Sequence, residues 1–69
     1  MTDTELFKKY ASKSGRSEEN IASLLNISPE AYKSKIDGKA EFCFSEISLL
    51  TYLFGLEEKP EVAKSIFFA

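Results

Sequence analysis

A single cysteine and the absence of histidine restrict how a chain of only 69 residues can be stabilised. A domain of this size buries only about 60% of the surface that its unfolded chain exposes, so it usually needs a disulfide, a metal, a partner or very regular helix packing. Cys43 alone forms no internal disulfide, and one Cys without His cannot supply the four ligands of a structural zinc site. The remaining source of stability is efficient helix packing within one domain, residues 1–69, with or without a partner subunit.

Helix start and stop signals divide the chain into five predicted short helices. The predicted starts are residues that cap a helix N-terminus, or proline at its first position: Asp3 or Thr4, Ser17, Ser28 with Pro29, Ser45, and Pro60. The first four helices are predicted to end at residues that accept a left-handed backbone: Gly15, Asn26, Gly38 and Gly55. Five short helices with short links favour an all-α cluster of crossing helices over a bundle of long ones.

Apolar residues recur at helical spacing within each predicted helix. The predicted inward faces are Leu6, Phe7, Tyr10 and Ala11; Ile21, Ala22, Leu24 and Leu25; Ala31, Tyr32, Lys35 and Ile36; Ile47, Leu50, Leu53 and Phe54; and Val62, Ala63, Ile66 and Phe67. Between the third and fourth helices, we expect Phe42 and Phe44 to anchor a loop to the core. We expect Cys43, between them, to be buried or half-buried.

The second and third predicted helices are joined by only about three residues, Asn26 to Ser28. Such a tight link forces the helices to cross near perpendicular, and the crossing requires a small residue where they touch. Ala22 is that residue, and Ile27 and Tyr32 close the crossing from the other side. This pattern is typical of a helix-turn-helix, which places the outer face of its second helix in the major groove of DNA.

The segment from Ser17 to Tyr32 resembles the helix-turn-helix of the phage Cro/repressor family (XRE-type). Lys35 to Phe42 is similar to the segment after that family's recognition helix, Ser45–Ile47 and Leu53–Leu56 match its fourth helix, and Ile66–Ala69 resembles the tail of small phage-borne members. The resemblance runs from about Leu6 to Ala69. It implies a lambda-repressor-like DNA-binding domain, with a recognition helix at about residues 29–36. The implied function is sequence-specific binding of double-stranded DNA by a small phage or bacterial transcription regulator.

The resemblance also implies a set of DNA-binding residues: Ser17, Glu18, Ser28, Pro29, Glu30, Lys33, Ser34 and Lys39. Ser17 and Ser28 are helix caps first, a role compatible with a phosphate contact. Lys33 and Ser34 are expected to project from the outer face of the third helix. Lys39 is expected to place its amine near a phosphate, with Arg16 and Lys13 flanking the same DNA backbone.

Three of these positions depart from the family pattern. The family usually has Gln where this chain has Glu18, and polar donors where it has Pro29 and Glu30. A carboxylate that faces phosphates is repelled unless it accepts a hydrogen bond from cytosine N4. The departures favour an alternative in which the chain is a protein-interaction module on a helix-turn-helix scaffold. In that alternative it is antirepressor-like and binds another regulator instead of DNA.

The distribution of charge is compatible with both functions. The net charge is −2, so the chain is not a generic binder of polyanions. Residues 1–39 carry seven cations and six anions, whereas residues 40–69 carry two cations and five anions. The cations are therefore concentrated in the part that contains the predicted helix-turn-helix.

Catalysis, cofactors and membrane insertion are not indicated. The chain has no histidine, no catalytic motif and too few residues for a deep cleft, so we expect no enzyme activity, no cofactor or metal, and no small-molecule substrate. Its apolar runs are far shorter than the roughly 20 residues of a membrane span. The polar start and the free Cys43 predict a cytoplasmic protein.

The apolar end of the chain predicts a weak homodimer. Phe67 and Phe68 are adjacent, and adjacent side chains point about 100° apart on a helix, so both cannot face one core easily. The second ring is then exposed or covered by a partner. Alternatively, Phe68 folds back over Leu56 of the same chain. Two copies on DNA half-sites about 34 Å apart would raise both affinity and specificity.

Overall fold

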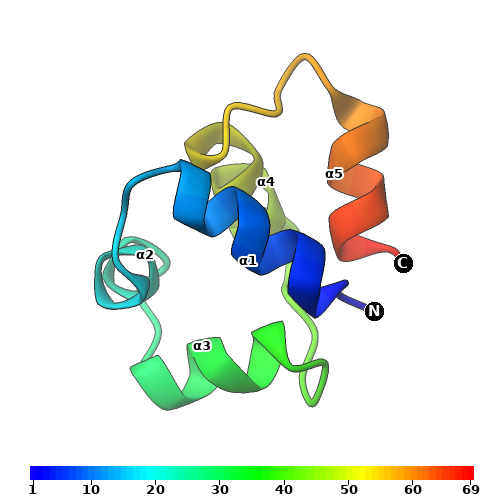
Figure 1. The fold of residues 1–69 in the computed structure, drawn as a ribbon. Coiled ribbons are helices and arrows are strands. Elements are labelled where there is room, and N and C mark those ends of the chain that lie inside the picture. The colour runs from blue at the N-terminus through cyan, green and yellow to red at the C-terminus, as the bar shows by residue number, and fades with distance from the viewer.

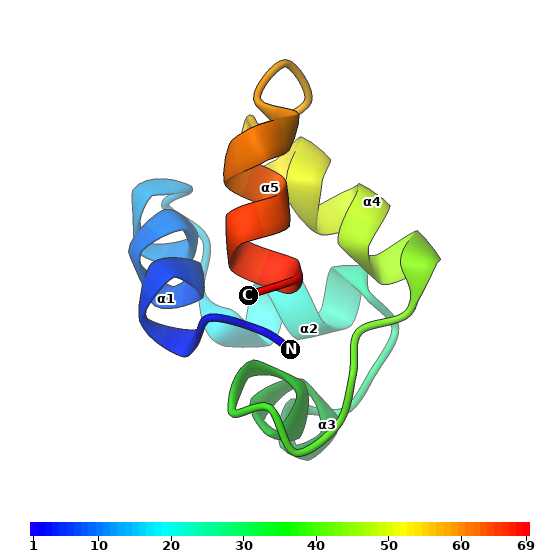
Figure 2. The same ribbon diagram turned by 90° about the vertical axis from the view of Figure 1, so that its right-hand side faces the viewer.

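The computed structural model describes all 69 residues and contains five helices and no strand. The helices are α1 (Thr4–Lys13), α2 (Glu18–Leu24), α3 (Pro29–Ile36), α4 (Phe44–Leu53) and α5 (Pro60–Phe67). The predicted all-α class with five short helices is confirmed. Both Figure 1 and Figure 2 show α3 at the edge of the molecule, at the opposite end from the start of α5. None of the helices has the length and apolar character needed to cross a bilayer.

The first three helices begin at the residues that the sequence predicts. The side chains of Asp3, Ser17 and Ser28 each accept a backbone N–H three residues later, all at 3.1 Å. These bonds satisfy donors that the first turn of a helix leaves without partners. Asn26, with φ at 60°, ends α2 in the left-handed conformation, as expected. The local chain chemistry therefore sets the position of the α2–α3 turn.

Phe7 of α1 is the centre of the core, and it is fully buried. Its ring lies 5.2–6.1 Å from four other aromatic rings, which belong to Tyr32, Phe42, Phe54 and Phe67. Three of these four pairs meet edge to face, an arrangement that aromatic quadrupoles favour. One side chain thus joins α1 to α3, to the loop before α4, to the end of α4 and to α5.

The predicted start of α4 at Ser45 is wrong. The N-cap is Cys43, whose backbone N–H donates to Glu46 Oε1 at 2.8 Å. Both carboxylate oxygens of Glu46 also accept from Lys35 Nζ, at 2.6 and 2.7 Å. Lys35 of α3 therefore holds Glu46 in place, and Glu46 sets the helix start two residues earlier than a cap at Ser45 would. The Ser45 hydroxyl lies 3.3 Å from Cys43 Sγ instead.

Several predicted burials are also wrong. Phe42 anchors the loop as expected, but Phe44 is 83% exposed because it occupies the first turn of α4 on its outer side. Cys43 is exposed, not buried. Leu24 is 44% exposed, because Ile21, Ala22 and Leu25 occupy the inward positions of α2.

The two chain ends are paired by backbone hydrogen bonds. Asp3 N–H donates to Ile66 O at 2.7 Å, and Ala69 N–H donates to Met1 O at 2.9 Å. Both views show the ends side by side (Figures 1 and 2). Phe67 is buried, whereas Phe68 is 67% exposed, and Leu56 is buried. The alternative in which Phe68 is covered within its own chain is therefore wrong.

Candidate functional site

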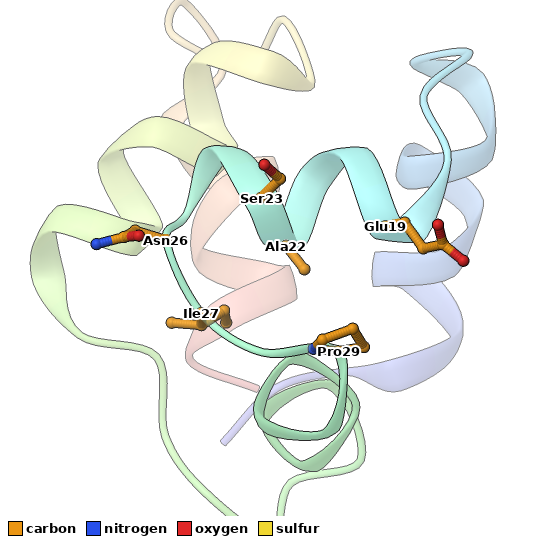
Figure 3. Close-up of a pocket in the computed structure, with 6 residues that line it drawn as sticks. All are labelled: Glu19, Ala22, Ser23, Asn26, Ile27 and Pro29. Carbon is orange, nitrogen blue, oxygen red and sulfur yellow. The ribbon is translucent and has the colours of Figure 1, made fainter.

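The crossing of α2 over α3 is built on Ala22. In Figure 3, α2 runs across the view and α3 is seen end-on beneath it, with the Ala22 methyl pointing towards α3. Ala22 is 1% exposed, and its carbonyl oxygen accepts the Ile27 N–H at 3.1 Å. Ile27 packs against the core from the turn, and Tyr32 is 2% exposed. The predicted packing of these three residues inside the molecule is confirmed, whereas the helix-turn-helix that they are expected to build stays a prediction.

The inner face of α3 is held by the core and by two polar ties. Tyr32 and Ile36 are buried, and Lys35 is bound by Glu46 of α4. The hydroxyl of Thr4, the first residue of α1, donates to Ile36 O at 2.6 Å. Helix α3 is therefore fixed in orientation from both α1 and α4.

The outer face of α3 is open to solvent at most of the predicted DNA-binding positions. Ser28, Pro29, Glu30 and Lys33 are all exposed. Ser34 departs from expectation because it is half-buried. Its carbonyl oxygen accepts the N–H groups of Lys39 and Ala40 at 2.9 and 3.3 Å, so the turn after α3 folds over this position.

Two of the three predicted serines, Ser17 and Ser28, lie at the starts of α2 and α3. Each hydroxyl oxygen already accepts one backbone N–H, from Asn20 for Ser17 and from Ala31 for Ser28. A hydroxyl that accepts one bond still has a proton to donate. Both serines are exposed, so each can donate to an external oxygen without losing its capping bond.

Most cations of the chain have no carboxylate partner. Lys35 is the only lysine or arginine that forms a salt bridge. Lys33 and Lys39 are exposed and unpaired, and Arg16 is bound only to the neutral Asn20 side chain at 3.2 Å. Lys13 lies over the Tyr10 ring, 5.2 Å from its centroid. These charges are available to an external anion.

Lys8 of α1 is a further exposed cation near these positions, and no pattern in the sequence indicated it. A hollow of about 250 Å³ is lined by Lys8, Glu18, Lys33, Ile36 and Asp37, and thus lies where α1, the start of α2 and α3 meet. Lys8 and Glu18 also line a neighbouring hollow of about 390 Å³ that reaches Arg16 and Ser17. Only the tertiary fold brings Lys8 beside Lys33, because the two are 25 positions apart in the chain.

The negative charge of Glu18 affects Tyr32 on the buried face of α3, and its side chain also lines this hollow. Burial raises the pKa of the Tyr32 phenol far above its ordinary value, and the negative charge of Glu18 raises it further. The Tyr32 hydroxyl is buried and has no hydrogen-bond partner. Tyr32 is therefore a neutral, unpaired phenol at neutral pH.

Two acidic residues, Glu19 and Glu30, lie near the turn between α2 and α3. The hollow in Figure 3, about 410 Å³, has a floor of Ala22, Ile27 and Pro29, and Glu19 lies on its rim. Glu19 and Glu30 are exposed and form no salt bridge. The surface of the α2–α3 unit thus carries unpaired charges of both signs: lysines towards α1 and the end of α3, carboxylates near the turn.

Comparisons with protein-family models, with curated proteins and with solved structures find no match. The family resemblance therefore rests on the residues and spacings of this chain alone.

Proposed function

We propose that the chain binds double-stranded DNA, with the outer face of α3 in the major groove, as a small transcription regulator. The main observation behind the proposal is that α3 is held on its inner face and open on its outer face. Its inner face is held by Lys35–Glu46 and by Thr4, while its outer face lies at the edge of the molecule beside unpaired cations. A rigidly held, protruding helix flanked by free lysines is what docking in a groove requires.

Each group has a distinct task in this binding mode. Lys33, Lys39, Lys8 and Arg16 would neutralise phosphates and set the position of the protein on the duplex. Glu30 would accept from a cytosine N4 amine, since a carboxylate can read no other major-groove donor as well. With so few cations, one copy binds weakly, and two copies on adjacent half-sites would provide the working affinity.

Glu18 opposes phosphate binding in this arrangement. Its carboxylate lines the same hollow as Lys8 and Lys33, so it offsets part of their positive potential. We expect Glu18→Gln to bind DNA several-fold more tightly at low salt and to lose that advantage as salt screens the charge. A Glu18→Gln variant that binds DNA more weakly would contradict this role.

The test is a fluorescence titration of duplex DNA from the protein's own locus at about 50 and about 200 mM salt. Lys33→Ala and Lys39→Ala should each reduce the slope of log K against log salt by about 0.9. Lys59→Ala is the matched control, because Lys59 precedes α5 at the end of the molecule opposite α3. Absence of binding at the lowest salt, or equal slopes in all three variants, would overturn the proposal.

The second candidate function is recognition of another regulator, and the carboxylates around the turn favour it. Glu19 lies unpaired at the hollow of Figure 3, whose apolar residues suit a partner's aliphatic side chain, and Glu30 is an unpaired carboxylate in the first turn of α3. The variant Glu19→Gln separates the two functions, because Glu19 is given no contact with DNA in the proposed binding mode. It should bind DNA at least as tightly as the parent if DNA is the ligand, and should lose affinity for a purified basic regulator of the same locus if that protein is the partner.

A further inference from the structure

Few side chains of α3 are free to meet a ligand. The exposed residues of the helix are Pro29, Glu30 and Lys33. The others are buried or half-buried, and Lys35 among them is bound to Glu46 of α4. Because α3 lies at the edge of the molecule in both views, these three side chains form its whole recognition surface (Figures 1 and 2).

The three exposed residues differ in what they can do on DNA. Lys33 only donates, and its charge suits the phosphates of any sequence. Pro29 has no backbone N–H and an apolar side chain. The Glu30 carboxylate only accepts hydrogen bonds, so its environment must supply a donor. Among the exposed residues of α3, Glu30 is therefore the one that can distinguish one base from another by acceptance.

The charge of Glu30 is not neutralised within the protein. Lys33 lies three positions later, on the same face of α3, but the two side chains form no salt bridge. A carboxylate that enters a groove between phosphates is repelled unless it gains a hydrogen bond there. Glu30 therefore weakens binding at every DNA site that offers it no donor, and by that penalty it adds specificity.

One base meets this requirement best. In the major groove, guanine presents two acceptors, and thymine presents an acceptor and a methyl group. Adenine presents an amine beside an acceptor, which faces the carboxylate unfavourably, whereas cytosine presents its N4 amine alone. The carboxylate of Glu30 therefore selects cytosine at the position that it faces.

We propose that binding requires the free N4 amine of one cytosine in the recognised site, and that a methyl group on that nitrogen switches binding off. This inference rests on the proposed function, in which Glu30 faces a base. One N4 hydrogen pairs with guanine, and the other points into the major groove. A methyl group on N4 of a paired cytosine takes the place of the second hydrogen, so the carboxylate loses its only donor.

A methyl group on the neighbouring carbon, C5, has a different consequence. It leaves both N4 hydrogens in place and resembles the methyl group of thymine, which apolar side chains contact in the major groove. Pro29 provides such an apolar surface, because it is exposed beside Glu30 at the first position of α3. The protein therefore discriminates between the two isomeric methylcytosines by hydrogen bonding and not by size.

The test begins with selection of binding sites from duplexes that carry a randomised segment. The wild type should select sites that share one cytosine. Glu30→Gln should select adenine there, because Gln pairs with the amine and N7 of adenine together. Its fold should survive, since Glu30 is exposed and forms no salt bridge. Glu19→Gln is the matched control, an exposed first-turn acid on α2, and should keep the cytosine.

The selected duplex is then made with N4-methylcytosine or 5-methylcytosine at the shared position and titrated with the wild type. The N4-methyl group should weaken binding between about fivefold and about 150-fold, the range for one lost base contact. The 5-methyl group should leave binding as tight or make it tighter. Glu30→Ala has no acceptor, so it should bind both methylated duplexes equally.

Three results would overturn the inference: equal weakening by both methyl groups, which indicates exclusion by size; selected sites that share no cytosine; and loss of the cytosine in Glu19→Gln as well. DNA binding without a cytosine requirement would remove this inference alone. Absence of binding to any duplex would remove the proposed function, and this inference with it.

Discussion

Tyr32 has the least favourable environment of any residue in the core. Its hydroxyl is buried without a hydrogen-bond partner, and the nearby Glu18 charge acts on the same group. A buried polar group left unpaired costs about 1–3 kcal/mol. The ring itself stabilises the core, because it packs beside the α2–α3 crossing and meets Phe7 edge to face.

We therefore predict that Tyr32→Phe raises the free energy of unfolding by about 1 kcal/mol, since it removes the unpaired hydroxyl and keeps the ring. Urea unfolding followed by circular dichroism measures this change. Tyr52→Phe is the control, because its exposed hydroxyl can bond to water in either state, and it should be neutral. A Tyr32→Phe variant less stable than the parent would show that the hydroxyl has a partner in solution.

Residues whose roles depend on near neighbours in the chain were predictable. Ser17, Ser28 and Asn26 act within three or four positions of themselves, so sequence rules for caps and turns locate them correctly. Lys8 was not predictable as part of the site, because its position beside Lys33 is a product of the packing of α1 against α3. Phe44 shows the same limit: helical spacing does not reveal which side of a first turn faces solvent.

At the scale of whole elements, the α2–α3 crossing depends on the size of one side chain. The methyl of Ala22 points towards α3, and the residue is 1% exposed. A larger side chain would have to push the two helices apart.

Ala22→Leu should destabilise the protein by about 1–3 kcal/mol through overpacking, and should lower Tm accordingly. Ala40→Leu gives a matched control, since Ala40 is exposed in the turn after α3. Thermal melts of both variants decide the point. If Ala22→Leu melts at the parental temperature, the assignment of Ala22 as the contact between the two helices is incorrect.

The link between α3 and α4 is electrostatic and should depend on pH. Burial raises the pKa of Glu46, but hydrogen bonds from Lys35 and from the Cys43 backbone outweigh it and hold the pKa below its ordinary value of 4.5. A carboxyl whose pKa is lower in the folded state stabilises the fold above the unfolded value. That contribution is lost as pH falls below about 4.5 and through the folded pKa.

We predict that Glu46→Gln costs about 1.5–3 kcal/mol at neutral pH, because it removes charged hydrogen bonds to Lys35 and to the start of α4. The difference from the wild type should shrink in acid, where the wild-type carboxyl is protonated. Urea titrations at neutral and acidic pH measure it, with Glu57→Gln as an exposed, unpaired control. Equal stability of Glu46→Gln and wild type at neutral pH would rule out the link.

The same link explains why sequence rules misplace the start of α4. Ser45 is a good N-cap by local criteria, whereas Cys43 is a poor one. The decisive interaction is the Lys35–Glu46 pair, which joins residues 11 positions apart. An acid three residues after the true N-cap was visible in the chain, but its partner on another helix was not.

At the scale of the whole molecule, the fold was more predictable than the site. Five helices and most of their inner faces follow from periodicity and caps, which are local and repeated, with the exposed Leu24 as an exception. The electrostatic character of the α2–α3 surface depends on where a few long side chains meet. Lys33, Glu18 and Glu30 have the same formal charges wherever they lie, and only their relative positions decide which ligand they favour.

The pairing of the two chain ends makes the backbone almost a closed ring. Ala69 N–H and Met1 O are 2.9 Å apart, so a linker of a few residues could join the ends without moving any helix. Cyclisation would then act on the unfolded chain alone, by removing the freedom of its ends, and the chain-entropy model sets that gain at roughly 4 kcal/mol. New ends could be opened in the exposed connection between α4 and α5 instead, giving a circular permutant with the same five helices.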